Sequence, residues 1–191
     1  MKKLALFASG NGTNVQQITE YFTGHPCGIT VDCVVYNRKE AFVATRAKNL
    51  GLPAFYMNKA DFYSGDKVLN LLKEREVDYI VLAGFLLLVP QNLLEAYPGR
   101  IINIHPALLP KYGGLGMYGH HVHEAVIAHH ETESGITIHL VDPQFDHGKT
   151  LFQAKCQLSP EDTPDTLAAM IHLLEKEHFP KVIEQFVNGK L

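Results

Sequence analysis

The feature that most constrains the fold is a regular alternation of short apolar runs with amphipathic segments through the first half of the chain. Leu4–Ser9 is a continuous apolar run, which is typical of a strand buried on both faces. A Gly-Asn-Gly turn follows, after which Thr13 or Asn14 is suited to cap a helix that reaches about Phe22. This β-α-β-α order predicts an α/β fold with a Rossmann-like, mostly parallel sheet flanked by helices.

The same alternation continues to about residue 104. Runs rich in branched and aromatic residues predict strands, and apolar residues at helical spacing predict helices. We expect strands at Val31–Tyr36, Ala54–Met57, Tyr79–Ala83 and Ile101–Ile104, and helices at Glu40–Leu50, Asp66–Glu76 and Pro90–Ala96.

The second half has a different pattern. His105–Gly119 is rich in glycine and holds two prolines, so it predicts a long irregular loop before a helix at Val122–His130. Ile136–Val141 and Thr150–Leu158 predict two strands joined through a turn, an antiparallel excursion from the parallel sheet. A last helix is expected to begin at Thr163 or Asp165, with Pro180 separating a second short helix that ends at Phe186. No repeat or linker interrupts residues 1–191, so we expect one domain.

Size and charge narrow the class of protein. Hydrophobic residues make up 46% of the 191 residues and charged residues 19%, as in an ordinary globular protein. The formal net charge is −3, and the basic residues are scattered, so we expect neither a nucleic-acid partner nor a membrane. The three cysteines, Cys27, Cys33 and Cys156, form no Cys-x-x-Cys pair, which favours free thiols in the cytoplasm.

Polar residues follow two of the predicted parallel strands, where open sheets bind ligands. Ser9-Gly10-Asn11-Gly12-Thr13-Asn14 closes the first strand and opens a helix, whose free N–H groups favour a phosphate. The loop matches neither Gly-x-Gly-x-x-Gly nor a P-loop, so a plain structural turn is an equal interpretation.

Asn103 and His105 lie at the end of the fifth strand. Alternation places both side chains on one side, and Pro106 holds His105 extended. An amide and an imidazole side by side can stabilise a developing oxyanion, and the imidazole can also move a proton. Asp146, in the turn between the late strands, can orient and charge His105 only if its loop folds back over the histidine.

Several histidines between residues 120 and 130 suggest a metal site at first sight. Their spacing lacks an i, i+4 pair with a companion acid, so we expect no metal. These histidines are His120, His121, His123, His129 and His130.

The motifs together resemble the phosphoribosylglycinamide formyltransferases of the folate-dependent formyltransferase superfamily, in order and over nearly the whole chain. The resemblance rests on the Ser9–Asn14 loop, Leu82-Ala83-Gly84-Phe85, the stretch Asn103-Ile104-His105-Pro106-Ala107-Leu108-Leu109-Pro110-Lys111-Tyr112, and Asp146. It implies formyl transfer from 10-formyltetrahydrofolate, as co-substrate, to the amine of glycinamide ribonucleotide in purine biosynthesis, by a monomer or homodimer. It also implies a phosphate-binding half, residues 1–100, and a catalytic and folate-binding half, residues 101–191.

The resemblance implies residue roles as well. Asn103, His105 and Asp146 would be catalytic; Gly12, Thr13 and Asn14 would hold the substrate phosphate; and Glu175 would bind the ribose. The folate would meet Phe85, Leu86, Leu87, Leu88, Val89, Asn103, Val141 and Asp146.

This sequence departs from the family pattern in two places. Leu86-Leu87 follow Gly84-Phe85 where the family often has Met-Arg; if that arginine helps anchor the acidic folate tail, Lys59 is the candidate to replace it. Lys176 follows Glu175 where the family often has histidine. The alternatives are a formyltetrahydrofolate hydrolase, a formyltransferase acting on another amine, and a non-catalytic Rossmann-like module that senses a nucleotide.

Overall fold

A computed structural model describes all 191 residues and has one seven-stranded sheet at its centre, in the order β3-β2-β1-β4-β5-β6-β7. The first five strands are parallel, β6 is antiparallel to β5, and β7 is antiparallel to β6. The predicted mostly parallel sheet with a late antiparallel excursion is therefore confirmed. The strands are β1 (Lys2–Ala8), β2 (Ile29–Tyr36), β3 (Ala54–Tyr56), β4 (Tyr79–Leu82), β5 (Ile101–His105), β6 (Glu133–Leu140) and β7 (Thr150–Gln157).

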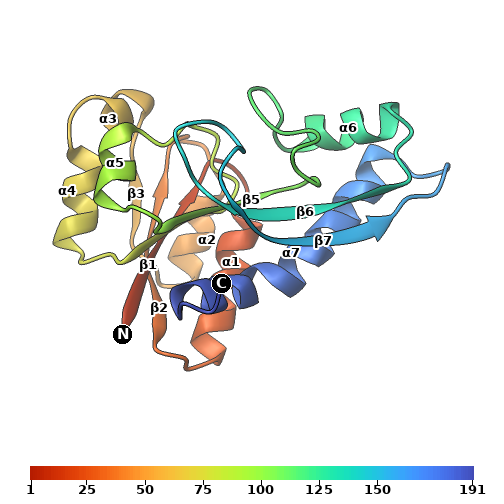
Figure 1. Cartoon of the computed structure of the whole chain (residues 1–191). Coiled ribbons are helices and arrows are strands. Elements are labelled where there is room, and N and C mark those ends of the chain that lie inside the picture. The colour runs from red at the N-terminus through yellow and green to blue at the C-terminus, as the bar shows by residue number, and fades with distance from the viewer.

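Helices cover both faces of the sheet (Figure 1). Helices α3, α4 and α5 contribute to one buried cluster, and α1, α2, α6 and α7 contribute to the other. The helices are α1 (Thr13–Gly24), α2 (Val43–Asn49), α3 (Lys59–Tyr63), α4 (Lys67–Glu74), α5 (Gln91–Ala96), α6 (His120–Ala128) and α7 (Pro164–Val187).

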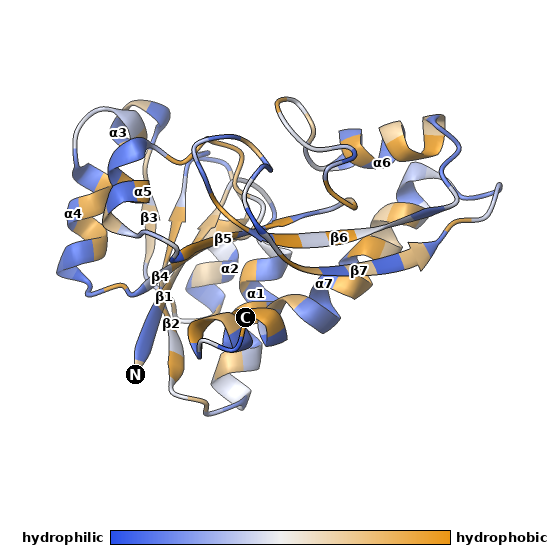
Figure 2. Ribbon diagram, in the orientation of Figure 1, coloured by the Kyte–Doolittle hydropathy of each residue, from blue (hydrophilic) through white to orange (hydrophobic).

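Strand β1 is buried on both faces, which explains its continuous run of apolar residues. Leu4 and Leu6 belong to the cluster beneath α1 and α7, whereas Ala5 and Phe7 belong to the cluster beneath α4 and α5. Alternate side chains enter opposite layers, so neither face tolerates a polar residue. Figure 2 shows the result, with hydrophobic colour along the central strands and mixed colour on the outer helices.

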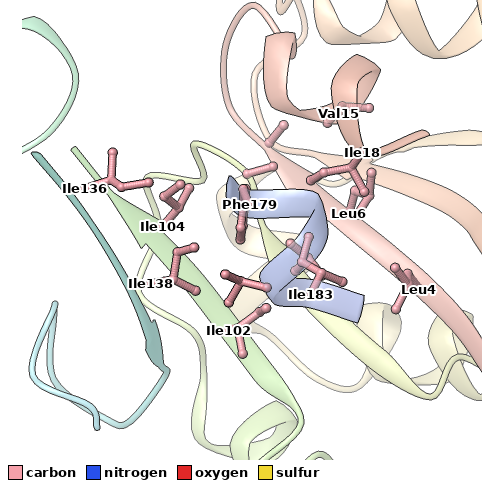
Figure 3. Packing of buried hydrophobic residues seen from close by; sticks show 14 of the residues in the cluster. Leu4, Leu6, Val15, Ile18, Ile102, Ile104, Ile136, Ile138, Phe179 and Ile183 are labelled. Carbon is pink, nitrogen blue, oxygen red and sulfur yellow. The ribbon is translucent and has the colours of Figure 1, made fainter. Parts of the chain in front are cut away.

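Helix α7 is one continuous helix, so the predicted break at Pro180 is wrong. A proline inside a helix removes one backbone hydrogen bond and costs about 3 kcal/mol. Phe179 and Ile183, on either side of Pro180, are fully buried against Ile102, Ile104 and Ile138 of the sheet (Figure 3). Burial of each large apolar side chain is worth about 1.5–3 kcal/mol, so the packing offsets the lost bond.

Two helix starts differ in detail from expectation. Helix α1 is preceded by Gly12 in the left-handed region and has no side-chain cap, so neither Thr13 nor Asn14 caps it. Helix α3 was not predicted; Asn58 and Asp61 form a capping box at its start. Thr163 caps α7, one of the two predicted starts, with Pro164 in the first turn. No helix is both long and apolar enough to cross a membrane.

Candidate active site

A cavity of about 420 Å³ opens at the carboxyl ends of β1, β4 and β5, the edge where open sheets bind ligands. Both halves of the chain line it. Of the residues singled out from sequence, it gathers Gly12, Thr13, Asn14, Phe85, Leu86, Leu87, Leu88, Val89, Asn103, His105, Val141, Asp146 and Glu175. Lys59 is exposed in the first turn of α3 and does not line the cavity.

Asn103 and His105 occupy the end of β5, as the strand pattern predicted. Strand β6 pairs alongside and places His139 directly opposite Asn103. His105 is only 3% exposed and His139 2% exposed, so both imidazoles sit in a low-dielectric pocket. Position on a rigid central strand fixes the direction of the Asn103 and His105 side chains.

The loop between β6 and β7 does fold back over β5 and brings Asp146 to His105. One Asp146 oxygen, Oδ2, lies 3.4 Å from Nδ1 of His105. The other, Oδ1, lies 3.4 Å from Nδ2 of Asn103 and 3.6 Å from Nε2 of His139. The carboxylate thus contacts all three side chains, an arrangement that sequence alone left open.

Tight backbone contacts hold Asp146 in this place. Its φ is 55°, in the left-handed region that aspartate tolerates better than most residues. The backbone N–H of Gly114 donates to Oδ2 at 3.0 Å. Gly148 lets the loop close, because a Cβ there would lie 1.8 Å from the carbonyl oxygen of Leu140.

His139 is a site residue that sequence reasoning missed. Its Nδ1 donates to the carbonyl oxygen of Leu140 at 2.7 Å, which leaves Nε2 to accept from Nδ2 of Asn103 at 3.1 Å. The amide is thereby oriented by the imidazole. Alternation along β6 places His139 on one face of that strand, but only the pairing register with β5 shows that it lies opposite Asn103.

Burial decides the charge of His105. It lowers the pKa of His105, and the opposing effect of Asp146 is too small to reverse the shift. The net shift is thus opposite to the expectation that Asp146 keeps His105 charged, because burial outweighs the carboxylate. Nε2 of His105 contacts the carbonyl oxygen of Tyr112 at 2.7 Å, so Nε2 carries the proton of a neutral ring.

Asp146 remains a carboxylate. Burial raises its pKa, but the neighbouring His139 and His105 and the hydrogen bond from the backbone N–H of Gly114 lower it by more, so the net pKa lies below the ordinary value. A buried, ionised carboxylate beside a neutral imidazole is suited to accept a proton.

The phosphate-binding candidates form the first turn of α1. Gly12 adopts φ 77°, and a Cβ there would lie 2.5 Å from Val43 Cγ2, so only glycine fits. Because no side chain caps α1, its first N–H groups remain available to an anion. Arg46 of α2 braces the loop by donating from Nε to the carbonyl oxygen of Asn11 at 2.8 Å.

The side chain of Asn14 is committed to a different partner. Its Nδ2 donates to Oε2 of Glu175 at 3.0 Å, which ties α1 to α7 inside the cavity wall. Glu175 is 8% exposed, and burial raises its pKa to about 7. Asn14 can therefore offer a phosphate its backbone N–H, while its side chain positions Glu175.

Besides His139, three basic residues of the cavity wall were given no site role from the sequence: Arg38, His123 and His172. Arg38 directly follows Asn37 beyond the end of β2, is exposed, and takes part in no ion pair or side-chain hydrogen bond. Its position shortly after a parallel strand could have indicated from the sequence that Arg38 lies at the ligand-binding edge of the sheet. Arg38 is a free cation that lines the same cavity as the uncapped start of α1.

The apolar wall opposite consists of Phe85–Val89 and Val141. Ser9 fixes this segment, because its Oγ accepts from the backbone N–H of Leu86 at 2.9 Å. Tyr63 donates to the carbonyl oxygen of Leu88 at 2.8 Å and so joins α3 to the same wall. A flat, apolar ring with polar edges would fit against this backbone.

Comparisons with known proteins agree with this geometry. The Formyl transferase family model matches residues 2–183. The phosphoribosylglycinamide formyltransferase of Bacillus subtilis is 36% identical, over 98% of this chain and 96% of that protein. The chloroplastic phosphoribosylglycinamide formyltransferase of Arabidopsis thaliana is 40% identical, but this chain spans 62% of its length.

A solved structure gives the same result. The crystal structure of phosphoribosylglycinamide formyltransferase from Bacillus halodurans matches with a TM-score of 0.88 and 34% identity, over 97% of this chain and 95% of that one. Because the family model spans nearly the whole chain and a relative of similar length shares more than a third of its residues, the chain belongs to the formyl transferase family.

Proposed function

We propose that this protein transfers a formyl group from 10-formyltetrahydrofolate to the amine of glycinamide ribonucleotide. The observation that carries the proposal is the convergence of Asn103, His105 and Asp146 in a cavity between a phosphate-binding loop and an apolar wall. The relatives of similar length carry the name of this activity.

The chemistry follows from these three side chains. The amine nitrogen of the ribonucleotide bonds to the formyl carbon, and the formyl oxygen becomes an oxyanion. Asn103 and the Nε2–H of His105 donate to this oxygen, and the Asp146 carboxylate accepts the proton that the amine loses. Collapse of the adduct breaks the bond to the folate nitrogen, which takes the proton held by Asp146 and leaves as tetrahydrofolate.

Both donors must be released from internal partners for this step. Nδ2 of Asn103 contacts Asp146 at 3.4 Å, a long and weak hydrogen bond that substrate can replace. Nε2 of His105 must exchange the carbonyl oxygen of Tyr112 for the oxyanion, so the imidazole and this carbonyl must move apart. One oxyanion donor is worth about 3–4 kcal/mol of the barrier, and holding two substrates together supplies much of the rest.

The remaining roles follow the shape of the cavity. The backbone of Gly12, Thr13 and Asn14 binds the phosphate, Glu175 binds the ribose, and Phe85–Val89 with Val141 binds the pterin ring. Lys59 anchors the folate tail only if that tail leaves the cavity toward α3.

This proposal also assigns a division of labour within one domain. Residues 1–100 supply the phosphate loop, and residues 101–191 supply the catalytic trio, although Phe85–Val89 and Glu175 cross that division. We propose a monomer or homodimer, and a cytoplasmic location that three free thiols support; the chloroplastic plant relative is a precedent for an organelle instead.

The test is turnover by purified, folded protein. Incubation with 10-formyltetrahydrofolate and glycinamide ribonucleotide should give the absorbance change of tetrahydrofolate release, and omission of the ribonucleotide should abolish it. Release without ribonucleotide would instead indicate a hydrolase. Ribonucleotide binding with no turnover would indicate that the protein is a non-catalytic module that senses a nucleotide.

A further inference from the structure

A cluster of potential metal ligands lies outside the cavity, where α1, the segment after it and the C-terminal part of α7 meet. His25 and Cys27 come from the connection between α1 and β2, and Glu184 comes from α7. One ligand atom from each residue, an imidazole nitrogen, the thiol sulfur and a carboxylate oxygen, lies within 4.8 Å of the others. None of the three lines the catalytic cavity.

We propose that His25, Cys27 and Glu184 form a binding site for a Zn²⁺ ion. Imidazole, thiolate and carboxylate are the three ligand types that zinc uses in proteins, and water can complete a tetrahedron. Ligand atoms around tetrahedral zinc are about 3.3–3.7 Å apart, given the usual metal–ligand distances. Nε2 of His25 and Oε2 of Glu184 are already 3.5 Å apart, so only small side-chain rotations are required.

The local backbone prepares this arrangement. Pro26 stands between His25 and Cys27 and fixes one of the torsions that separate them. His25 has an extended φ of −129°, as expected before proline, so the chain turns away from α1 at this residue. Cys27 is half-buried and unpaired, which leaves its sulfur free to bind a metal.

Tyr21 supplies the outer support that metal sites usually have. Its hydroxyl donates to Oε2 of Glu184 at 2.6 Å, which fixes the carboxylate and leaves its other lone pairs free. The ring centroid of Tyr21 lies 5.4 Å from that of His25, so the same side chain also restricts the imidazole.

Bound zinc would join elements from opposite ends of the sequence. It would link the α1–β2 connection to α7, the helix that carries Glu175 about 13 Å earlier along its axis. The Cys27 thiol would lose its proton on binding. Zinc would stabilise the fold by mass action and take no part in formyl transfer.

The proposed site is separate from the histidines near α6, for which no metal is expected, and from the catalytic chemistry, which uses none. Sequence spacing gives no hint of it, because Glu184 is remote from His25 and Cys27 in the chain. Only the packing of α1 against α7 brings the ligands together.

Co²⁺ provides the sharpest test, because a cobalt–thiolate bond gives a near-ultraviolet charge-transfer band that oxygen and nitrogen ligands do not. We expect chelator-treated, full-length protein to show this band at one Co²⁺ per chain and to lose it when Zn²⁺ is added. Cys27→Ser should abolish the band, and Tyr21→Phe should weaken Zn²⁺ binding at least about tenfold.

Cys156→Ser is the matched control, since Cys156 is another half-buried free thiol. It should keep the band, and Zn²⁺ should raise its melting temperature as in the wild type, whereas Cys27→Ser should show no such rise. Absence of the band in the wild type, its persistence in Cys27→Ser, or its loss in Cys156→Ser would overturn the proposal. The transferase assignment is independent of this result, because the readout is ligation rather than turnover.

Discussion

Asp146 is the residue on which the proposed catalytic geometry depends, because one carboxylate contacts Asn103, His105 and His139 together. Its pKa stays below the ordinary value despite burial, so it remains a base across the neutral range. His105, whose pKa is lowered, remains neutral under the same conditions. The site therefore pairs an ionised base with neutral donors.

Asp146→Asn should lower turnover at least about tenfold with little change in ribonucleotide affinity, because the amide cannot accept the amine proton as a carboxylate does. Steady-state kinetics and equilibrium binding of the ribonucleotide measure the two effects separately. Glu161→Gln, at an exposed acidic residue that does not line the cavity, is the control and should stay near wild type. Normal turnover of Asp146→Asn would remove its catalytic role.

Glu175 makes the protein less stable as pH rises. Its pKa is about 7 in the folded protein against 4.5 ordinarily, so the folded state holds the proton more tightly. The free energy of unfolding therefore falls by about 3 kcal/mol as the pH rises from about 4.5 to about 7, because each unit of difference in pKa corresponds to about 1.36 kcal/mol.

Glu175→Gln removes this penalty and keeps an acceptor for Asn14. Urea unfolding should find the variant more stable than wild type near pH 8, with a much smaller gain near pH 5. An equal gain at both pH values would show that charge burial is not the cause.

Arg38 tests the phosphate end of the cavity. Arg38→Gln should raise the KM for the ribonucleotide about tenfold and leave kcat nearly unchanged, since a hydrogen bond to a charged group is worth about 1.5–3 kcal/mol. Lys39→Gln, an exposed neighbour that does not line the cavity, is the control for net charge. The same rise in KM in both variants would mean that the ribonucleotide responds to the net charge of the protein and makes no specific contact with Arg38.

At the scale of elements, the β6–β7 connection is the part that carries Asp146 to the site. Gly148→Ala should place Cβ 1.8 Å from the carbonyl oxygen of Leu140 and force the loop outward. We expect a loss of about 1–3 kcal/mol in the free energy of unfolding together with lower kcat. Gly24→Ala meets nothing within 4 Å and is the control. An unchanged kcat in Gly148→Ala would show that the position of this loop does not affect catalysis.

Sequence patterns predicted the elements that bury apolar faces and missed those defined by tertiary contact. The apolar runs at β1 and β5 and the helical spacing at α4 are clear in the residues, so the positions of these elements followed from the sequence. The continuity of α7 through Pro180 depends on packing of Phe179 and Ile183, which no local pattern reports.

The same distinction holds within the site. Asn103 and His105 were predictable because they share one strand end. Asp146 needed the family resemblance to be placed, and His139 and Arg38 were missed, because strand register and loop path bring them to the cavity.

At the scale of the whole molecule, the cavity joins the Gly12–Asn14 loop, an apolar wall and the side chains of Asn103, His105 and Asp146 across two halves of one sheet. The arrangement suits two substrates held side by side, with the reacting atoms above the end of β5. Transfer between substrates, rather than release to water, is the property this shape should produce.

An isotope experiment measures that property directly. With 10-formyltetrahydrofolate labelled in the formyl carbon, glycinamide ribonucleotide and the wild-type protein, the label should appear in the ribonucleotide as a formamide, one for each tetrahydrofolate formed. Asp146→Asn should slow this transfer at least about tenfold. Label recovered as formate, or label that stays on the folate, would contradict the assignment of a formyltransferase that acts on this ribonucleotide.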